Sequence, residues 1–384
     1  MTAHDGARPG AAPRSVQDPQ ALTPSLLDVP SAAIRQFAIT GELSEVHAHQ
    51  RGHIHDTFIS TWRQADGSEK RYLHQRMNDR VFQDIPALMH NIERVTSFLK
   101  HSPEQDGLET LVLVPTRGGE TFLATTDGPW RTYNFIDGSL SYDHCENPDQ
   151  AYRAARAFGG FQRRLLGLDA SELVMTIPRF FSSPYRLEQL DEARRADSCG
   201  RVAEAAEELS FVEQRRSLVP VIEAALREGR FPSRVVHGDT KLNNVLFDAA
   251  SSEARCVVDL DTCMPGYSLY DFGDLVRFTA ATSDEDEQDL DRAGMDLGLY
   301  EALVRGYLEG TDGFLTGEER ELMPLSARLV TLTIGMRFLA DHLAGDVYFK
   351  ISRPGHNLDR ARVQFAMVAD MEAKDREMVR AVEA

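Results

Sequence analysis

The residue pattern changes once along the chain, and this change constrains the fold more than any other feature. Up to residue 136 most segments are rich in β-forming residues and are separated by turn residues. From Asp149 onward helical spacing dominates, except for a short β island between Ser233 and Val258. This order predicts an α+β fold with a small N-terminal antiparallel sheet lobe and a larger, mainly helical C-terminal lobe. The predicted strands lie at residues 42–50, 55–62, 71–77, 111–114 and 130–136.

One helix is predicted among these strands. It begins after Asp84, which is a plausible N-cap, and Pro86 stands in its first turn. Apolar residues then recur at spacings of three and four, which places them on one face: Ile85, Leu88, Met89, Ile92, Val95, Phe98 and Leu99. The N-terminal lobe is therefore expected to carry one amphipathic helix.

Composition excludes several classes of partner. The formal net charge of −18 argues against nucleic acid and against an anionic membrane surface, because both need clustered Lys and Arg. The four cysteines form no C-x-x-C pair, which is typical of reduced thiols in a cytosolic protein. No unbroken apolar run approaches the ~20 residues that span a bilayer. A cytoplasmic protein with neither a nucleic-acid nor a membrane partner is expected, and its oligomeric state is unknown.

The chemistry is concentrated in a polar loop between two apolar segments. Residues 237–244 carry an acid, a lysine and two amides, bracketed by Val235–Val236 and by the apolar trio 245–247. A second apolar strand ends in Asp259. Phosphoryl transfer needs a base for the attacking hydroxyl and oxygen ligands for Mg²⁺. Asp239 can be the base, while Asn244 and Asp259 can hold the metal.

This arrangement resembles a known family. His237-x-Asp239, followed by Asn244 and then by Asp259, resembles the catalytic segments of aminoglycoside-phosphotransferase-like kinases, which are themselves similar to protein kinases. Within that superfamily the chain resembles the N-acetylhexosamine 1-kinases most closely. The resemblance runs from about Ile34 to Ala366 and rests on residues 52–57, 75–78, 237–244, 259–266, 270–277 and 344–349.

The resemblance implies a protein-kinase-like two-lobed fold and an ATP- and Mg²⁺-dependent reaction. Asp239 is then the catalytic base and an acceptor contact, with Asn244 and Asp259 as Mg²⁺ ligands. The implied substrate is a small-molecule sugar, an N-acetylhexosamine phosphorylated at its anomeric hydroxyl. Residues 1–25 are interpreted as a disordered tail, 26–136 as the nucleotide-binding lobe, and 137–384 as the catalytic and acceptor-binding lobe.

A second D-F-G-like triplet begins at Asp271. It comes too late after the catalytic loop to be the metal site, so Asp271 is expected to cap the next helix and to hydrogen-bond the catalytic-loop backbone.

Nucleotide contacts are predicted less sharply. Gly52 and His53 lie in a turn whose N–H groups could meet the phosphates, although the same residues suit a plain hairpin. Kinases of this fold usually carry a phosphate-binding lysine on the third strand, but residues 72–77 contain none, which leaves Arg76 as the charged alternative. The adenine is expected to dock by backbone bonds near Tyr133, Phe135 and Ile136.

The acceptor candidates lie late in the chain. Arg337 and Tyr348 are expected to contact the sugar, because a planar guanidinium suits sugar hydroxyls. Arg337 and Asp341 could instead form an ordinary i,i+4 salt bridge. His55 is a further candidate, with a purely structural histidine as its alternative.

Other interpretations of the sequence stay open. The same fold could phosphorylate an aminoglycoside, choline, homoserine or another sugar, or could bind nucleotide without turnover. A metal hydrolase built on His53 and His55 is a more remote possibility, because it lacks further ligands at suitable spacing. The sequence fixes neither the acceptor sugar, nor a need for its N-acetyl group, nor the residue that replaces the missing lysine.

Overall fold

Two compact units make up the protein. A computed structural model describes residues 30–49, 54–102 and 107–384 of the chain. The first unit ends at Val81 and takes in Leu113–Phe135, and the second comprises Phe82–Val112 and Ile136–Ala384. The first is a sheet and the second is mainly helical, so the predicted α+β, kinase-like fold is confirmed.

The first unit is built on a five-stranded antiparallel sheet with the order β1-β2-β3-β5-β4. Residues 111–114 were predicted as a strand, but they form only an isolated bridge from Leu113 to Tyr133. The N–H of Val114 still donates to Thr132, after which Pro115 has no N–H with which to continue the ladder. The strands are β1 (Glu42–His49), β2 (Asp56–Arg63), β3 (Glu69–Arg76), β4 (Leu123–Thr125) and β5 (Gly128–Asn134).

One face of this sheet carries the core of the first unit. Trp62 and Trp130 on the sheet pack against Ile34 and Phe37 from the segment that precedes β1. His74 of β3 is fully buried on the same face, between the hydroxyls of Ser60 at 2.7 Å and Thr132 at 2.8 Å. Burial lowers the pKa of His74 to about 3, so its ring is a neutral hydrogen-bonding member of the core.

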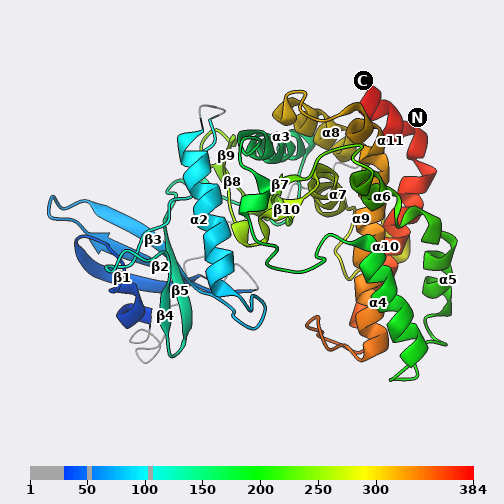
Figure 1. Ribbon diagram of the computed structural model, residues 1–384, viewed down its shortest axis with the longest axis horizontal. Coiled ribbons are helices and arrows are strands. Elements are labelled where there is room, and N and C mark those ends of the chain that lie inside the picture. Colours follow the sequence, from blue (N-terminus) through cyan, green and yellow to red (C-terminus); the bar gives the residue numbers. More distant parts are fainter. Residues whose placement is uncertain (1–29, 50–53, 103–106) are drawn as a thin grey trace, which may run out of the picture. The chain divides into compact units, whose positions relative to one another are not determined.

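The second unit is a helical assembly with small sheets inserted in it (Figure 1). Its short strands form one three-stranded sheet, β6-β8-β9, and one two-stranded sheet, β10-β7. These strands are β6 (Ser139–Leu140), β7 (Arg234–Val236), β8 (Val245–Asp248), β9 (Ala254–Val257) and β10 (Met264–Gly266). The helices are α2 (Ile85–His101), α3 (Pro148–Arg164), α4 (Ser183–Ala196), α5 (Ala206–Gln214), α6 (Val221–Arg227), α7 (Ser268–Thr279), α8 (Leu297–Thr311), α9 (Gly317–Ala344), α10 (His356–Ala373) and α11 (Asp375–Glu383).

Helix α2 forms as its sequence pattern predicts. The Asp84 side chain accepts the N–H of Ala87, and a proline occupies the first turn. Its contacts lie within the second unit, although the sequence placed it with the N-terminal strands. Asn91 of α2 is buried and donates to the carbonyls of Val174 at 2.8 Å and Cys263 at 3.0 Å.

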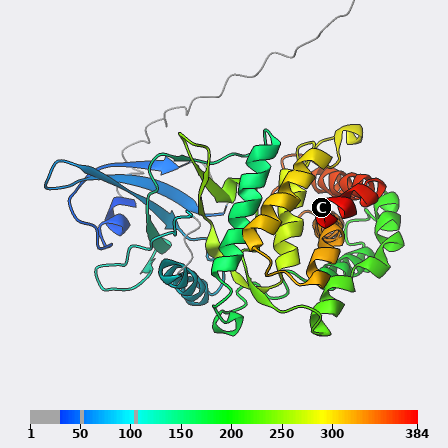
Figure 2. The same cartoon turned by 90° about the horizontal axis from the view of Figure 1, so that it is seen from above.

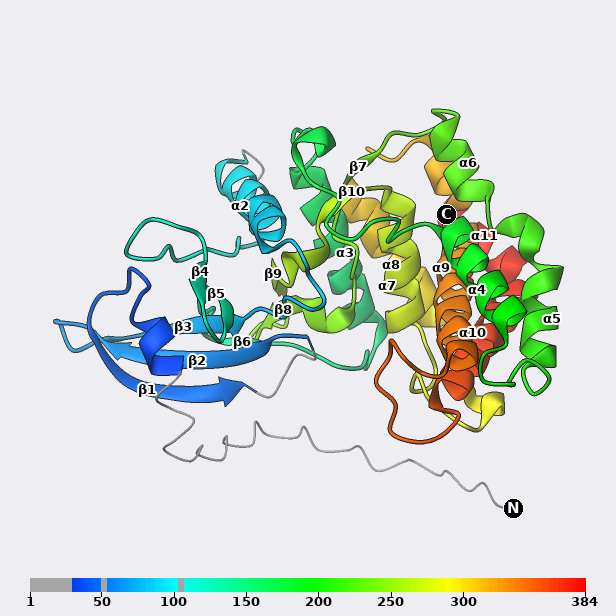
Figure 3. The same cartoon turned by 60° about the horizontal axis from the view of Figure 1, so that its bottom comes forward.

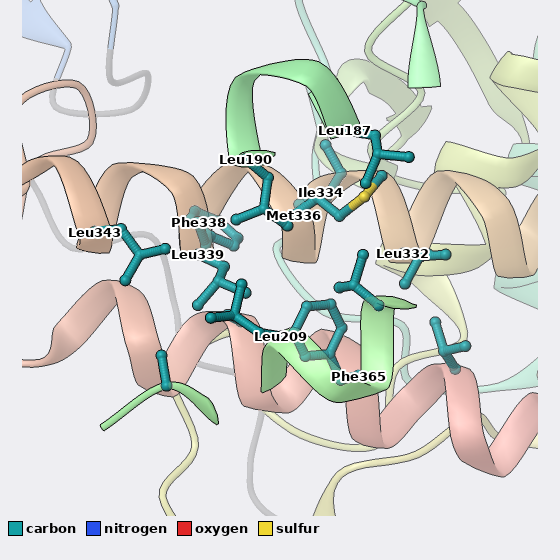
Figure 4. Packing of buried hydrophobic residues seen from close by; sticks show 14 of the residues in the cluster. Leu187, Leu190, Leu209, Leu332, Ile334, Met336, Phe338, Leu339, Leu343 and Phe365 are labelled. Atoms are coloured by element: carbon teal, nitrogen blue, oxygen red, sulfur yellow. The ribbon is translucent and has the colours of Figure 1, made fainter. Parts of the chain in front are cut away.

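Helix α9 is the central element of the second unit. A capping box between Thr316 and Glu319 starts it, and Gly345 ends it with a φ of +98°. Figure 3 shows α4 and α10 beside it, and Figure 4 shows the apolar side chains that α4 and α9 share. An apolar stretch of α9 has the length and hydropathy to cross a membrane, but 78% of it is buried inside the protein. Arg328 and Arg337 interrupt this helix, so its sequence contains no unbroken apolar run of ~20 residues.

Helices α3 and α8 lie side by side (Figures 1 and 2), and their backbones approach closely where they cross. Glycines make this possible: a Cβ built on Gly306 would lie 2.2 Å from the carbonyl oxygen of Tyr152, and one on Gly310 would lie 2.4 Å from that of Arg156. Backbone cannot move aside as a flexible side chain can, so α3 has a fixed distance from α8.

Gly306→Ala is therefore expected to destabilise the protein by roughly 1–3 kcal/mol, because the added methyl forces the helices apart. Urea unfolding measures this loss. Gly317→Ala is the matched control, since its Cβ would meet nothing within 4 Å and the change is expected to be neutral or slightly stabilising. Equal midpoints for Gly306→Ala and the wild type would show that the crossing can relax.

Candidate functional site

Two strands bring the predicted metal ligands together. Strands β8 and β9 pair antiparallel, with Val245 opposite Val257, so the residues just before β8 and just after β9 are neighbours. Asn244 precedes β8, and its carbonyl accepts the N–H of Val258 at 2.9 Å. Asp259 follows directly. The site therefore places Asn244 and Asp259 side by side although 14 residues of chain separate them.

One buried carboxylate, that of Asp271, holds the polar loop at residues 237–244 in place. Asp271 is inaccessible to solvent, and its two oxygens accept the N–H groups of His237 and Gly238, both at 2.8 Å. Gln162 of α3 donates to the same carboxylate at 2.5 Å, and the Tyr307 hydroxyl of α8 donates to the Gln162 side-chain oxygen at 3.1 Å. Burial raises the pKa of Asp271, while the neighbouring His237 and these hydrogen bonds act in the opposite direction.

The predicted contact of Asp271 with the catalytic-loop backbone is thus confirmed. The predicted capping role is wrong: Tyr267 is the N-cap of α7, no side chain caps that end, and Asp271 lies within the first turn. The Asp271 side chain accepts from the N–H groups of His237 and Gly238 instead of from the N-terminal N–H groups of α7.

The loop leaves β7 through a glycine that nothing larger could replace. Gly238 has a φ of +80°, and a Cβ there would lie 2.8 Å from the carbonyl oxygen of Thr262 and 3.0 Å from the Phe181 ring. His237 before it is buried, with its Nε2 at 2.9 Å from the carbonyl of Val258. These contacts turn the chain so that the next residue, Asp239, reaches the partly accessible side of the loop.

Asp239 lies among groups that hold its carboxylate in one place. The Lys241 ammonium is 2.9 Å from one carboxylate oxygen and 3.0 Å from the other. Asn244 donates through Nδ2 to the backbone carbonyl of Asp239 at 2.8 Å and to its side chain at 3.2 Å. Burial opposes the charge of Lys241, but Asp239, Asp274 and Asp259 together raise its pKa above the ordinary value.

The donor set next to Asp239 fits a hard divalent cation. Because Asn244 donates with Nδ2, its Oδ1 carries the lone pairs, and no donor to it occurs among the contacts of the described residues. Asp259 adds a half-exposed carboxylate from a left-handed backbone conformation, with φ and ψ both 62°. One amide oxygen and one carboxylate, with room for ligand oxygens, are the protein ligands that Mg²⁺ usually takes.

The late acceptor candidates lie around one ordered loop. Asp341 of α9 accepts the N–H groups of Val347, Tyr348 and Phe349 at 2.8–2.9 Å. Asn357 of α10 donates to it as well, at 2.9 Å. The alternative of a simple Arg337–Asp341 salt bridge is therefore not what the structure shows: the carboxylate organises the loop and leaves Tyr348 70% exposed.

Arg337 lies among aromatic rings instead. Its guanidinium carbon is 5.4 Å from the centre of the Phe349 ring and 5.9 Å from the rings of Phe180 and Tyr348. Tyr270 of α7 is within electrostatic range of both Arg337 and Asp239. The Asp239 and Arg337 parts of the predicted site thus lie near the same residue of the second unit.

The remaining candidates lie elsewhere. Gly52 and His53 fall outside the described residues. In the first unit, Arg76 donates twice to Asp56, at 2.6 and 2.9 Å, and His55 accepts the N–H of Asn78 at 3.0 Å.

The predicted adenine-contacting segment spans the boundary between the units. Tyr133 is a buried residue of β5, and Phe135, which lies under the Arg71 guanidinium, is the last residue of the first unit. Ile136 opens the following segment of the second unit, and its carbonyl accepts the Ser139 hydroxyl at 2.7 Å.

Comparison of the sequence with models of protein families identifies the family to which the chain belongs. The model of a family described as the phosphotransferase enzyme family, APH, matches residues 62–311, which is well over half of the chain. The chain belongs to the APH phosphotransferase family. Its loop and its two-unit architecture are thus those of a phosphotransferase.

Solved structures agree on the fold of this APH phosphotransferase. An aminoglycoside phosphotransferase from Alicyclobacillus acidocaldarius is 16% identical with a TM-score of 0.59, and the match covers 97% of this chain and 99% of that one. A microcompartment-associated aminopropanol kinase is 17% identical, with a TM-score of 0.57 and coverages of 92% and 98%. An amicoumacin kinase in complex with AMP-PNP, Ca²⁺ and Ami is 14% identical, with a TM-score of 0.53 and coverages of 90% and 93%.

Several residues that hold the candidate site in place carry no signal in the sequence. Gln162 and Tyr307 stabilise the Asp271 carboxylate, and Asp274 accepts the N–H of Thr240 at 3.0 Å. Arg186 of α4 is within electrostatic range of Arg337. No local pattern distinguishes these side chains, because each acts on a partner more than 30 residues away.

Asp271→Asn is expected to destabilise the phosphotransferase by roughly 2–4 kcal/mol and to lower its activity, since an amide N–H would then face one of the loop N–H groups. Thermal and urea unfolding measure the stability. Asp143→Asn on the exposed surface is the control and is expected to change the free energy of unfolding by less than about 0.5 kcal/mol. Wild-type stability in Asp271→Asn would contradict the anchoring role.

Proposed function

We propose that the protein is an ATP- and Mg²⁺-dependent sugar kinase that phosphorylates the anomeric hydroxyl of an N-acetylhexosamine. The observation that carries this proposal is the position of the Asp239 carboxylate, held on a rigid loop beside Asn244 and Asp259. Family membership supports phosphoryl transfer, and the resemblance of residues 237–244 and 259–266 to N-acetylhexosamine 1-kinases supports the acceptor.

In this proposal Asp239 orients the acceptor hydroxyl and takes its proton. The acceptor oxygen forms a bond to the γ-phosphorus of ATP while the bond from that phosphorus to the bridging oxygen breaks, and ADP leaves. An anomeric hydroxyl is more acidic than an ordinary alcohol, so a carboxylate base of ordinary strength suffices. Lys241, paired with Asp239, keeps the carboxylate oriented and adds positive charge where charge develops on phosphate oxygens.

Asn244 and Asp259 would hold Mg²⁺, which when bound neutralises phosphate charge and fixes the triphosphate for in-line attack. The left-handed backbone at Asp259 ends the extended run of β9, one residue after the backbone bond that joins Val258 to Asn244. We propose further that the backbone of Tyr133, Phe135 and Ile136 receives the adenine, and that Gly52, His53 and Arg76 serve the phosphates. Arg76 would exchange its Asp56 partner for phosphate oxygens.

The surroundings of Arg337 favour an acceptor that is not a cation. Aminoglycosides and aminopropanol, which the similar structures are named for, carry amines that carboxylates would bind. The contacts of Arg337 are instead with three aromatic rings, a second arginine lies within electrostatic range, and no carboxylate pairs with Arg337 among the described residues. We therefore propose Arg337, Tyr348 and Asp239 as acceptor contacts, with His55 as an additional one from the first unit.

Asp239→Asn is expected to lower kcat by roughly 10²–10⁴, because the proton acceptor is lost, while nucleotide binding and folding persist, because asparagine keeps the shape of the side chain and one oxygen that can accept from Lys241. ADP release is measured with N-acetylglucosamine, N-acetylgalactosamine, glucose, galactose, kanamycin, choline and homoserine, and ³¹P NMR identifies the product. A sugar 1-phosphate that disappears in the variant supports the proposal. Turnover of kanamycin or choline alone would rule out a sugar acceptor, and undiminished turnover in Asp239→Asn would rule out Asp239 as the base.

Asp259→Asn is expected to raise the half-saturating Mg²⁺ concentration roughly tenfold or more, because a charged metal ligand becomes neutral. Asparagine is chosen because it tolerates the left-handed conformation that alanine would strain. The readout is the Mg²⁺ dependence of ADP release at saturating acceptor, with Asp143→Asn as the control for loss of one charge. A metal dependence identical to the wild type would exclude Asp259 as a ligand.

A further inference from the structure

Two arginines from different helices lie near one another in the second unit. Arg186 belongs to α4 and Arg337 to α9, which pack together along their length (Figures 3 and 4). The Ser183 and Thr333 hydroxyls join these helices at 2.8 Å, about one helical turn before the two arginines. Leu187 lies beside Ile334 in the same seam, as Figure 4 shows. Arg186 and Arg337 are therefore close enough to interact electrostatically.

Neither arginine has an acidic partner in the part of the chain that the structure describes. Arg186 donates through Nη1 to the neutral side chain of Gln189 at 2.8 Å, and its Nε is buried with no hydrogen-bond partner. Arg337 makes ring contacts but no hydrogen bond or ion pair with a described residue. This is unusual in a chain where 60 acidic residues outnumber 42 Lys and Arg.

The nearby carboxylates are committed elsewhere. Asp341, one turn after Arg337, accepts the N–H groups of the loop at residues 347–349. Glu188, two residues from Arg186, pairs with Arg179 at 3.6 Å. Glu223 accepts the Ser182 hydroxyl at 3.2 Å through Oε2, and its Oε1 is buried without a hydrogen bond to either arginine. The two guanidinium groups thus remain without a countercharge from these carboxylates.

Holding two unneutralised cations together in a partly buried place costs free energy. Burial and the charge of Arg337 both lower the pKa of Arg186, although a guanidinium stays protonated at physiological pH. A buried guanidinium donor without an acceptor adds a desolvation penalty. A bound anion would remove both costs, because its oxygens accept from the N–H groups and its charge offsets the two cations.

This cationic pair adjoins the reaction centre through Tyr270. The Tyr270 ring is 4.5 Å from that of Phe181 and 6.3 Å from that of Phe180, the aromatic neighbour of Arg337. Tyr270 is also within electrostatic range of Asp239. The two arginines and Asp239 therefore lie near the same buried ring, which is the basis for an acceptor that contacts the arginines and Asp239 together.

We propose that Arg186 and Arg337 form an anion-binding subsite for the acceptor, so that the substrate is a sugar carrying an acidic group, a carboxylate or a phosphate, in addition to the hydroxyl that is phosphorylated. This inference rests on the proposed sugar-kinase function and goes beyond it, because the preferred sugar carries an acidic group that a plain N-acetylhexosamine lacks. A neutral hydroxyl or acetamide oxygen can accept a guanidinium hydrogen bond, but it leaves the two positive charges uncompensated. Tyr348, exposed beside Arg337, offers its ring to the sugar.

The test compares acceptors that differ only in charge. Glucose, glucuronic acid and glucose 6-phosphate share the anomeric hydroxyl, and galactose with galacturonic acid forms a second pair. The acidic members are expected to have a kcat/KM roughly 10- to 100-fold above their neutral counterparts, mainly through KM. The carboxylate and phosphate arms identify which anion the subsite takes. Equal or higher kcat/KM for the neutral sugars, N-acetylglucosamine included, would overturn the proposal while leaving a sugar kinase.

Substitutions test whether a preference for acidic acceptors depends on Arg186 and Arg337. Arg337→Gln and Arg186→Gln are each expected to remove most of the preference for the acidic acceptor, because kcat/KM falls much further for the acidic member of each pair than for its neutral counterpart. Arg186→Lys, which keeps the charge, is expected to retain part of it. Arg179→Gln is the matched control, because Arg179 lies on the same Tyr185 ring as Arg186 but is paired with Glu188. A preference that survives both glutamine variants would show that another site provides it.

A binding measurement separates this subsite from catalysis. Sulfate is expected to raise the thermal unfolding midpoint of the wild type and of Arg179→Gln more than that of Arg337→Gln, at ionic strength matched with chloride. General salt effects of sulfate are common to all variants and cancel in the comparison. If no sugar is phosphorylated but this sulfate difference is found, the sugar-kinase function is wrong and the anion subsite stands. The same sulfate response in every variant would overturn the subsite.

Discussion

The carboxylate of Asp271 is the interaction on which the candidate site depends. A carboxylate taken out of water is costly unless its oxygens are fully hydrogen-bonded. Here His237, Gly238 and Gln162 supply the donors, and Gln162 is in turn held by Tyr307. The loop therefore takes its position from helices α3, α7 and α8 together. The glycine-mediated crossing of α3 and α8 sets the distance at which this network closes, so the geometry around Asp239 is a property of the whole helical unit.

The features that could be predicted from the sequence depend on interactions between residues that are close together in the chain. The loop at residues 237–244 and the strand before Asp259 are short-range patterns, and the antiparallel β8–β9 pair brings Asn244 beside Asp259 as those patterns require. Helix α2 likewise begins at the Asp84 cap expected from local residues. The prediction of a strand at residues 111–114 was wrong because it relied on their apolar composition and did not take into account that Pro115 cannot continue the hydrogen-bond ladder.

Features that depend on distant contacts could not be predicted in this way. Nothing near Arg186 in the sequence indicates Arg337, which joins it only because α4 packs along α9. The i,i+4 spacing of Arg337 and Asp341 predicts a salt bridge, yet Asp341 is occupied by three loop N–H groups and by Asn357. Several amide donors fix a carboxylate more firmly than one mobile guanidinium does, and their tertiary arrangement is invisible to helical spacing.

The role of Asp341 bears directly on specificity. If Asp341 paired with Arg337, the acceptor region would hold a neutralised arginine and a mobile loop; as it stands, the loop is ordered and the arginine keeps its charge. The chain as a whole has a net charge of −18 and would repel an anion at long range. That repulsion is screened beyond ~8 Å at physiological ionic strength. The proposed preference for an acidic sugar therefore has to arise at contact, from the two guanidinium groups and their aromatic surroundings, and it should appear mainly as slower dissociation of the bound acceptor rather than as faster association.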